Sequence, residues 1–112
     1  MNGEKNLKVA LLLDHYSPML TEKQRDVIDL YYNEDLSLAE IAEHENITRQ
    51  GVRDSIKRGE QALFELEEAL GLSRKSDELF EIARDLEDAV SGLDSETAAR
   101  IRLAADKIKN IL

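Results

Sequence analysis

Cysteine and tryptophan are absent from the sequence, and there is a single proline. Because no cysteine is present, disulfide bridges, thiolate metal sites and cysteine nucleophiles are excluded. Long apolar runs are also missing: the longest, Val9 to Leu13, is too short to span a bilayer or to form the core of a signal peptide. The sequence therefore predicts a cytoplasmic protein that does not insert into a membrane.

Positive charge is scarce as well. The 112 residues include 15 Lys+Arg against 24 Asp+Glu, a formal net charge of −9, which argues against a protein that coats nucleic acid or adheres to anionic lipid. The imbalance is local: residues 60–96 hold three basic and twelve acidic side chains, whereas residues 47–59 hold four basic and one acidic. We therefore expect any nucleic-acid contact to be local, with the acidic stretch left as a surface for a basic partner.

Apolar residues recur at helical spacing along the whole chain, and no alternating pattern typical of strands occurs. With 42% hydrophobic and 35% charged residues, the composition is that of a globular protein. The sequence predicts an all-α fold with six helices, at about residues 4–16, 21–32, 37–44, 48–70, 77–91 and 95–112.

Capping signals define several of these helix ends. Thr21 and Ser37 are each followed three residues later by Gln or Glu, which is the spacing of a capping box. Gly71 is placed to end the fourth helix as a C-terminal glycine cap. Either Asp94 or Ser95 caps the last helix.

The helices divide into two groups. The first helix carries apolar residues on more than one face, so we expect it to be wedged between others. The polar residues 73–76 indicate a junction between the fourth and fifth helices. We therefore expect a helix-turn-helix domain over residues 1–71 and an acidic helical extension, a helix pair, over residues 72–112.

The most specific pattern runs from Leu38 to Lys57. A short helix with a small inward residue, Ala42, is followed by a tight turn and by a second helix capped by Thr48. Two short helices that cross steeply need a small residue at the contact, and Asn46 in the turn tolerates a left-handed conformation. These features are typical of a helix-turn-helix.

The second helix of this motif has a candidate contact face. If Val52 and Ile56 point inward, a helical rotation of about 100° per residue turns a polar, mainly basic set outward. Such side chains suit guanine edges, adenine edges and phosphates. The alternative is a solvated face on an ordinary helix pair. The candidate nucleic-acid-binding residues are Arg49, Gln50, Arg53, Lys57 and Arg58.

Apolar residues of the fourth helix repeat at spacings of four and three, which is a heptad seam. The seam serves either to pack helices within one chain or to pair the helix with its copy in a homodimer, as helix-turn-helix proteins that reach two half-sites require. We favour the homodimer slightly. The candidate residues for this dimer or packing seam are Leu63, Phe64, Leu66 and Leu70.

Five short motifs resemble region 4 of bacterial sigma factors, which reads a promoter element with such a helix. These motifs are residues 20–25 (Leu-Thr-Glu-Lys-Gln-Arg), 27–32, 37–42, 47–53 (Ile-Thr-Arg-Gln-Gly-Val-Arg) and 56–60. The whole chain is more similar to the YlxM-like family of Gram-positive bacteria, through the Leu-Leu-Leu-Asp-His-Tyr run at residues 11–16 and the Arg-Gln-Gly-Val-Arg-Asp run at residues 49–54.

The resemblance implies a helix-turn-helix regulatory protein encoded beside genes of the signal recognition particle, with a role in that pathway. On this basis DNA is the first candidate partner. The alternative is an adaptor that does not bind DNA and contacts the particle's RNA or its GTPase.

No pattern of catalytic or metal-binding residues was found. His15 and His44 are the only histidines, and no second histidine lies at helical spacing from either. The adjacent pair Glu67-Glu68 is typical of a solvated acidic face. There is no phosphate-binding glycine loop or nucleotide fingerprint. The sequence therefore predicts a protein that is not an enzyme and needs no cofactor or metal.

Overall fold

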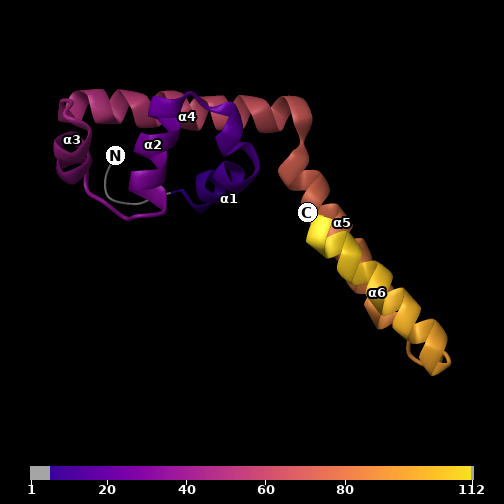
Figure 1. Ribbon diagram of the computed structural model, residues 1–112. Helices are drawn as coiled ribbons and strands as arrows, with labels where there is room; N and C mark the ends of the chain where they lie inside the picture. Colours follow the sequence, from indigo (N-terminus) through magenta and orange to yellow (C-terminus); the bar gives the residue numbers. More distant parts are fainter. Residues whose placement is uncertain (1–5, 112) are drawn as a thin grey trace. The chain divides into compact units, whose positions relative to one another are not determined.

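The computed structural model describes residues 6–111, and this part of the chain is helical without strands (Figure 1). The all-α prediction is confirmed. The chain divides into two compact units, the first ending at Gly71 and the second beginning at Leu72. The elements are α1 (Leu7–Tyr16), the short 3-10 helix η1 (Ser17–Met19), α2 (Glu22–Tyr32), α3 (Leu38–Glu45), α4 (Arg49–Leu70), α5 (Leu72–Asp88) and α6 (Ser95–Ile111).

The predicted caps are present. The side chains of Thr21 and Ser37 accept hydrogen bonds from the third residues of α2 and α3, and both capping boxes are complete. Asn46 ends α3 in the left-handed region, with φ 55° and ψ 46°. Gly71 ends α4 with φ 64°, which a residue without Cβ adopts freely.

In the first unit, α1, α2 and α3 all pack against α4 (Figure 1). Two clusters of buried residues result, and both include residues of α2 and α4. The cluster toward α1 contains Val9, Leu12, Leu13, Tyr16, Leu20, Ile28 and Leu63. The cluster toward α3, called here the motif core, contains Val27, Tyr31, Ile41, Val52 and Ile56.

The contact between α2 and α4 depends on Gly59. A Cβ at this position would lie 2.1 Å from Cδ1 and 3.1 Å from Cγ1 of Ile28, which is itself fully buried. The backbone of α4 can therefore approach α2 this closely only because residue 59 has no side chain.

Two tyrosine hydroxyls join α1 and α2 to α4. Tyr16 donates to Oε1 of Glu67 at 2.6 Å, and Tyr32 donates to Oε2 of Glu60 at 3.1 Å. Burial, followed by the negative charge of Glu60, raises the pKa of Tyr32. The expectation that Glu67 belongs to a solvated face is wrong, because its carboxylate is partly buried in this bond.

The prediction of a wedged first helix is also wrong. One stripe of α1 lies in the core, but Leu7 is 80% exposed and Leu11 is 60% exposed on the other side. The contacts of α1 with other helices go mainly to α4, so only one of its faces is covered. The predicted start at Glu4 lies outside the described residues, and within them α1 begins after Asn6, whose side chain caps it.

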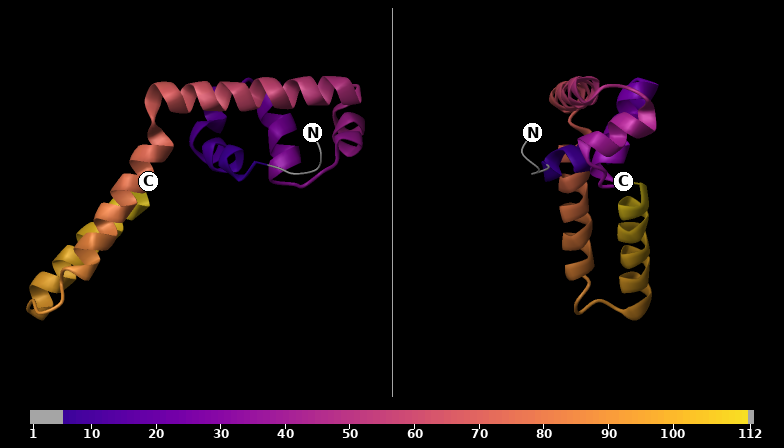
Figure 2. Two further views of the ribbon diagram at one scale, coloured as in Figure 1. Left: turned by 180° about the vertical axis from the view of Figure 1, so that it is seen from behind. Right: turned by 90° about the vertical axis from the view of Figure 1, so that its left-hand side faces the viewer.

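The second unit is a pair of helices, α5 and α6, lying side by side (Figure 2). Their contact is made by small residues, because Ala83, Val90, Ala98 and Ala105 are the buried apolar side chains of this unit. Asp94 is the cap of α6: its carboxylate accepts from the backbone N–H of Thr97 at 3.0 Å. Hydrogen bonds from the side chain of Thr97, and then from its backbone N–H, lower the pKa of Asp94.

The predicted polar junction at residues 73–76 is wrong. α5 begins at Leu72, directly after Gly71, and it ends at Asp88 rather than at Ser91. The left-handed Gly71 is sufficient to end one helix and allow the next to start. The Ser, Arg and Lys residues of the stretch are compatible with a first helical turn.

Candidate nucleic-acid interface

The turn between α3 and α4 is held by backbone and side-chain hydrogen bonds. The N–H of Ile47 donates to the carbonyl of Ala42 at 3.0 Å, which closes the end of α3. Thr48 then caps α4 by accepting from the N–H of Gly51 at 2.9 Å. The chain therefore leaves one helix and enters the next within three residues, as a helix-turn-helix requires.

The motif core determines which side of α4 faces outward. Val52 and Ile56 are fully buried against Ile41 of α3 and against α2. Ala42 and Leu38 are half-buried beside them. Because these contacts come from two neighbouring helices, the first three turns of α4 are fixed in rotation about the helix axis.

All five residues predicted to bind nucleic acid lie on exposed positions of α4. The inward placement of Val52 and Ile56 is confirmed, while the binding role of the exposed residues stays a prediction. Within residues 6–111, none of the four cations among them forms an ion pair. They are therefore available to a ligand. The exposed residues are Arg49, Gln50, Arg53, Lys57 and Arg58.

Gln50 is less free than the sequence suggested. Its side-chain amide donates to Oδ1 of Asp54, one turn later, at 3.0 Å. An adenine edge would have to compete with this bond or use the remaining groups of the amide. Sequence reasoning missed the contact, although the spacing of four between a Gln and an Asp is the available signal.

Exposed acidic side chains on α3 would limit how a duplex could approach the motif. Glu40 and Glu43 are exposed on this helix. The backbone and side chain of Ser37 both hydrogen-bond to Glu40 and lower its pKa, so that this carboxylate is charged at neutral pH. A phosphate backbone would be repelled by these carboxylates and attracted by the cations of α4.

The predicted seam residues divide between core and surface. Leu63 is fully buried in the cluster toward α1, and Phe64 and Leu66 pack against the same cluster. Leu70 is 40% exposed. Three of the four residues therefore contribute to packing within the chain, and pairing of α4 with a second copy through them stays a prediction.

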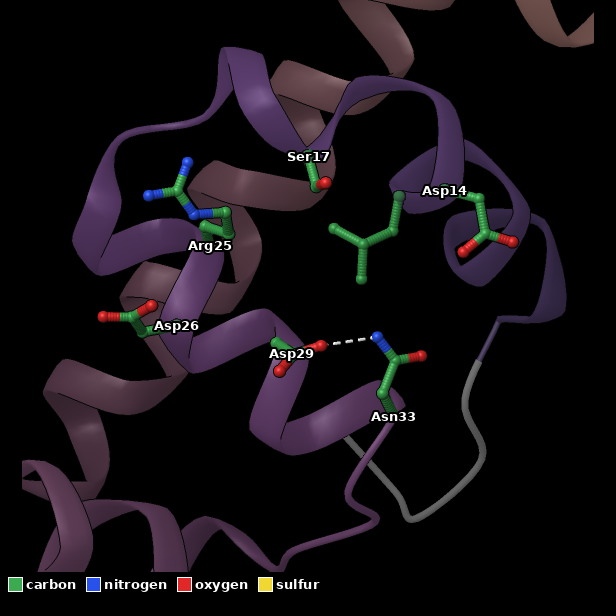
Figure 3. A pocket seen from close by; sticks show the side chains of 7 residues that line it. Asp14, Ser17, Arg25, Asp26, Asp29 and Asn33 are labelled. Atoms are coloured by element: carbon green, nitrogen blue, oxygen red, sulfur yellow. Dashed lines mark hydrogen bonds between the residues drawn. The ribbon is translucent and has the colours of Figure 1, made fainter. Parts of the chain in front are cut away.

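A polar cavity of about 370 Å³ lies on the first unit, lined by α1, the start of η1 and α2 (Figure 3). Its aspartates, Asp14, Asp26 and Asp29, do not converge on one point, and Asp29 accepts a hydrogen bond from Asn33 at 2.6 Å. Among residues 6–111, no group of three or more acidic or histidine side chains is placed to hold a metal ion. No helix in the same range has the length and apolarity to cross a membrane.

Comparison with known proteins agrees with this geometry. Residues 3–101 match a family model described as "Putative helix-turn-helix protein, YlxM / p13 like". A relative named "UPF0122 protein" from Clostridium kluyveri is 44% identical over 109 residues, which cover 97% of this chain and 96% of the relative. Another of the same name, from Desulforamulus reducens, is 51% identical over 105 residues, covering 94% of this chain and 87% of the relative.

Proposed function

The chain belongs to the family of YlxM/p13-like helix-turn-helix proteins, and we propose on this premise that it is a regulatory protein that binds duplex DNA through the outward face of α4. Arg53 and Lys57 contact guanine edges or phosphates, and Arg49 and Arg58 contact phosphates at the two sides of this face. Gln50 is the candidate reader of an adenine edge.

One observation carries the proposal. Four exposed cations without ion-pair partners lie on the one face of α4 that the motif core turns outward. Ordinary solvated helix faces mix both charges, whereas residues 47–59 contain a single acidic side chain, Asp54. The net charge of −9 opposes binding, so we expect weak binding that weakens further with salt, by about 0.9 log units per log unit of salt for each phosphate contacted.

Arg53→Glu tests the proposal. Binding of random-sequence duplex DNA is measured by fluorescence anisotropy at low salt for the wild type and for two variants. Arg84→Glu is the control, since Arg84 is an exposed arginine on α5 and its substitution changes the net charge by the same amount. We expect Arg53→Glu to abolish binding and Arg84→Glu to leave it nearly unchanged. No binding by the wild type, or equal losses in both variants, would refute a role for this face.

A second candidate function rests on the distribution of charge. The acidic side chains of residues 60–96 complement a basic protein, and the α4 cations suit RNA phosphates as well as DNA phosphates. We propose as the alternative that the protein is an adaptor for the RNA or the GTPase of the signal recognition particle. Its link to that pathway rests on the family resemblance.

Co-purification separates the two functions. The chain is captured from cells, washed at increasing salt, and its partners are divided into protein, RNA and DNA fractions. Recovery of particle RNA or GTPase that is lost with salt supports the adaptor. Recovery of DNA alone refutes it and supports the first proposal.

A further inference from the structure

The second unit leaves its large apolar side chains outside. The buried apolar residues between α5 and α6 are three alanines and one valine. In contrast, Leu79 is 42% exposed, Ile82 is 52% exposed and Ile111 is 84% exposed. The pair therefore buries small side chains between its two helices and exposes large ones. Its hydrophobic face is directed away from the contact between α5 and α6.

These exposed residues form one face by their spacing. On α5 they repeat as Leu79, Ile82 and Leu86, at intervals of three and four. On α6 half-buried Ile101 and Ile108 and exposed Ala104 and Ile111 repeat at intervals of three, four and three. Both series are heptad stripes of the kind that pack in helical bundles. We define the hairpin face as Leu79, Ile82, Leu86, Ile101, Ala104, Ile108 and Ile111.

The two stripes lie on the same side of the helix pair. The side chain of Lys109 contacts the carboxylate of Glu87 and lies 5.2 Å from the ring centroid of Phe80, so these three residues mark one side of the pair. With a rotation of about 100° per residue, the apolar stripe on each helix lies on one side of the contact between α5 and α6, and Phe80, Glu87 and Lys109 lie on the other side. The hairpin face is therefore continuous across α5 and α6.

We propose that a second copy of this chain covers the hairpin face, so that two α5–α6 pairs form a four-helix bundle. A unit of this size, residues 72–112, is near the lower limit for independent folding, and its four small buried side chains supply little core. Two such pairs packed face to face bury both stripes in the arrangement usual for antiparallel bundles.

Charge at the edges of the hairpin face points to a second copy rather than to a different partner. Glu78 and Asp85 lie seven residues apart along the outer edge of the stripe on α5. Arg100 and Lys107, also seven apart, lie along the outer edge of the stripe on α6. Over the length from Glu78 to Asp85 the face is thus acidic at its α5 edge and basic at its α6 edge, which makes this part of it complementary to itself.

The same charges select one of two symmetric arrangements. A two-fold axis parallel to the helices places each α5 beside the α6 of the other copy, so that acidic edges meet basic edges. A two-fold axis across the helices places α5 beside α5 and α6 beside α6, so that like charges meet. We therefore expect the parallel axis.

Substitution within the face tests whether it is the interface. The molar mass of the full chain is measured by light scattering and by sedimentation across a range of concentrations. Ile82→Asp places a charge in the proposed interface, and we expect it to raise the dimer dissociation constant by at least about a hundredfold. Leu103→Asp is the matched control, because Leu103 is 56% exposed but lies away from the stripes, and we expect it to remain dimeric.

Charge exchange tests the proposed arrangement of the two copies. Its result does not depend on a single variant, which could lose dimerisation because it fails to fold. The pair Glu78→Lys and Asp85→Lys makes both edges basic, and the pair Arg100→Glu and Lys107→Glu makes both acidic. We expect each double variant to be monomeric alone, and an equal mixture of the two to form heterodimers.

Three results would overturn the proposal. They are a wild-type chain that is monomeric at every concentration, equal effects of Ile82→Asp and Leu103→Asp, and double variants that dimerise alone as well as they do when mixed. A monomeric wild type would mean that the face is covered by another part of the chain or by another protein. The DNA-binding proposal is measured separately, so either proposal can fail without the other.

Discussion

Gly59→Ala is the substitution whose effect follows most directly from the structure. The new Cβ would lie 2.1 Å from Cδ1 of Ile28, a side chain with no exposure and β-branched stiffness. Overpacking of this kind costs about 1–3 kcal/mol, whereas replacing a helical glycine by alanine contributes about 1 kcal/mol of helix propensity. The balance is a net loss of about 1 kcal/mol in the free energy of unfolding.

The reasoning is checked by removing the atom that clashes. Ile28→Val deletes Cδ1 and leaves Cγ1 at 3.1 Å, a contact that is relieved by a shift of a few tenths of an ångström, so in that background most of the clash is removed and the gain in helix propensity remains. We therefore expect Gly59→Ala to destabilise the wild type but to be neutral or stabilising when Ile28→Val is present. As a comparison on the same helix, Gly51→Ala brings its Cβ no closer than 3.2 Å, to Oγ1 of Thr48, so we expect it to be less destabilising than Gly59→Ala.

Tyrosine fluorescence during urea unfolding is the suitable assay. All three tyrosines, Tyr16, Tyr31 and Tyr32, lie in the first unit and the chain has no tryptophan, so the signal reports that unit alone. A loss of about 1 kcal/mol lowers the urea midpoint by about 0.5–1 M. If Gly59→Ala had the same effect with and without Ile28→Val, close approach at this position would not be the reason for the glycine.

Two further predictions concern helix ends. Asn46→Ala places a Cβ-bearing residue without a polar side chain at φ 55°, and we expect a loss of about 1 kcal/mol in urea unfolding, while Asn46→Gly is tolerated. Asp94 has a lowered pKa in the folded chain. The stability that its carboxylate contributes to the fold is therefore fully present above the unfolded pKa of about 3.9, and it is lost as the pH falls through the lower pKa of the folded chain. Thermal unfolding followed by far-ultraviolet circular dichroism from pH 6 to pH 2 should therefore show a smaller loss of stability in Asp94→Asn, which keeps a capping side chain, than in the wild type. Equal losses would contradict this account.

Local signals allowed the helix-turn-helix to be predicted. The caps at Thr21, Ser37 and Thr48 and the left-handed Asn46 depend on residues within four positions of each other, so the sequence alone contains the information. The inward direction of Val52 and Ile56 follows from helical periodicity in the same way.

Features that depend on contacts distant in sequence were not predicted. Leu7 and Leu11 form a regular apolar stripe, but whether a stripe is covered depends on what packs against it. The bond from Tyr16 to Glu67 joins residues 51 positions apart, and nothing near either residue indicates it. The predicted start of α5 is wrong for a different reason: a polar stretch is typical of a junction, but here a single glycine is sufficient to end the preceding helix.

The length of α4 has a mechanical consequence. It is one uninterrupted helix of 22 residues, with the unpaired cations on its first three turns and Gly71 immediately after its last residue. At 1.5 Å per residue the helix is a rod about 33 Å long. Tilting its first turns by about 10° would displace its far end by about 6 Å, because a helix of this length moves as a rigid lever. If a ligand binds the outward face as proposed, a change in the angle at which it meets that face would shift Gly71 relative to the ligand.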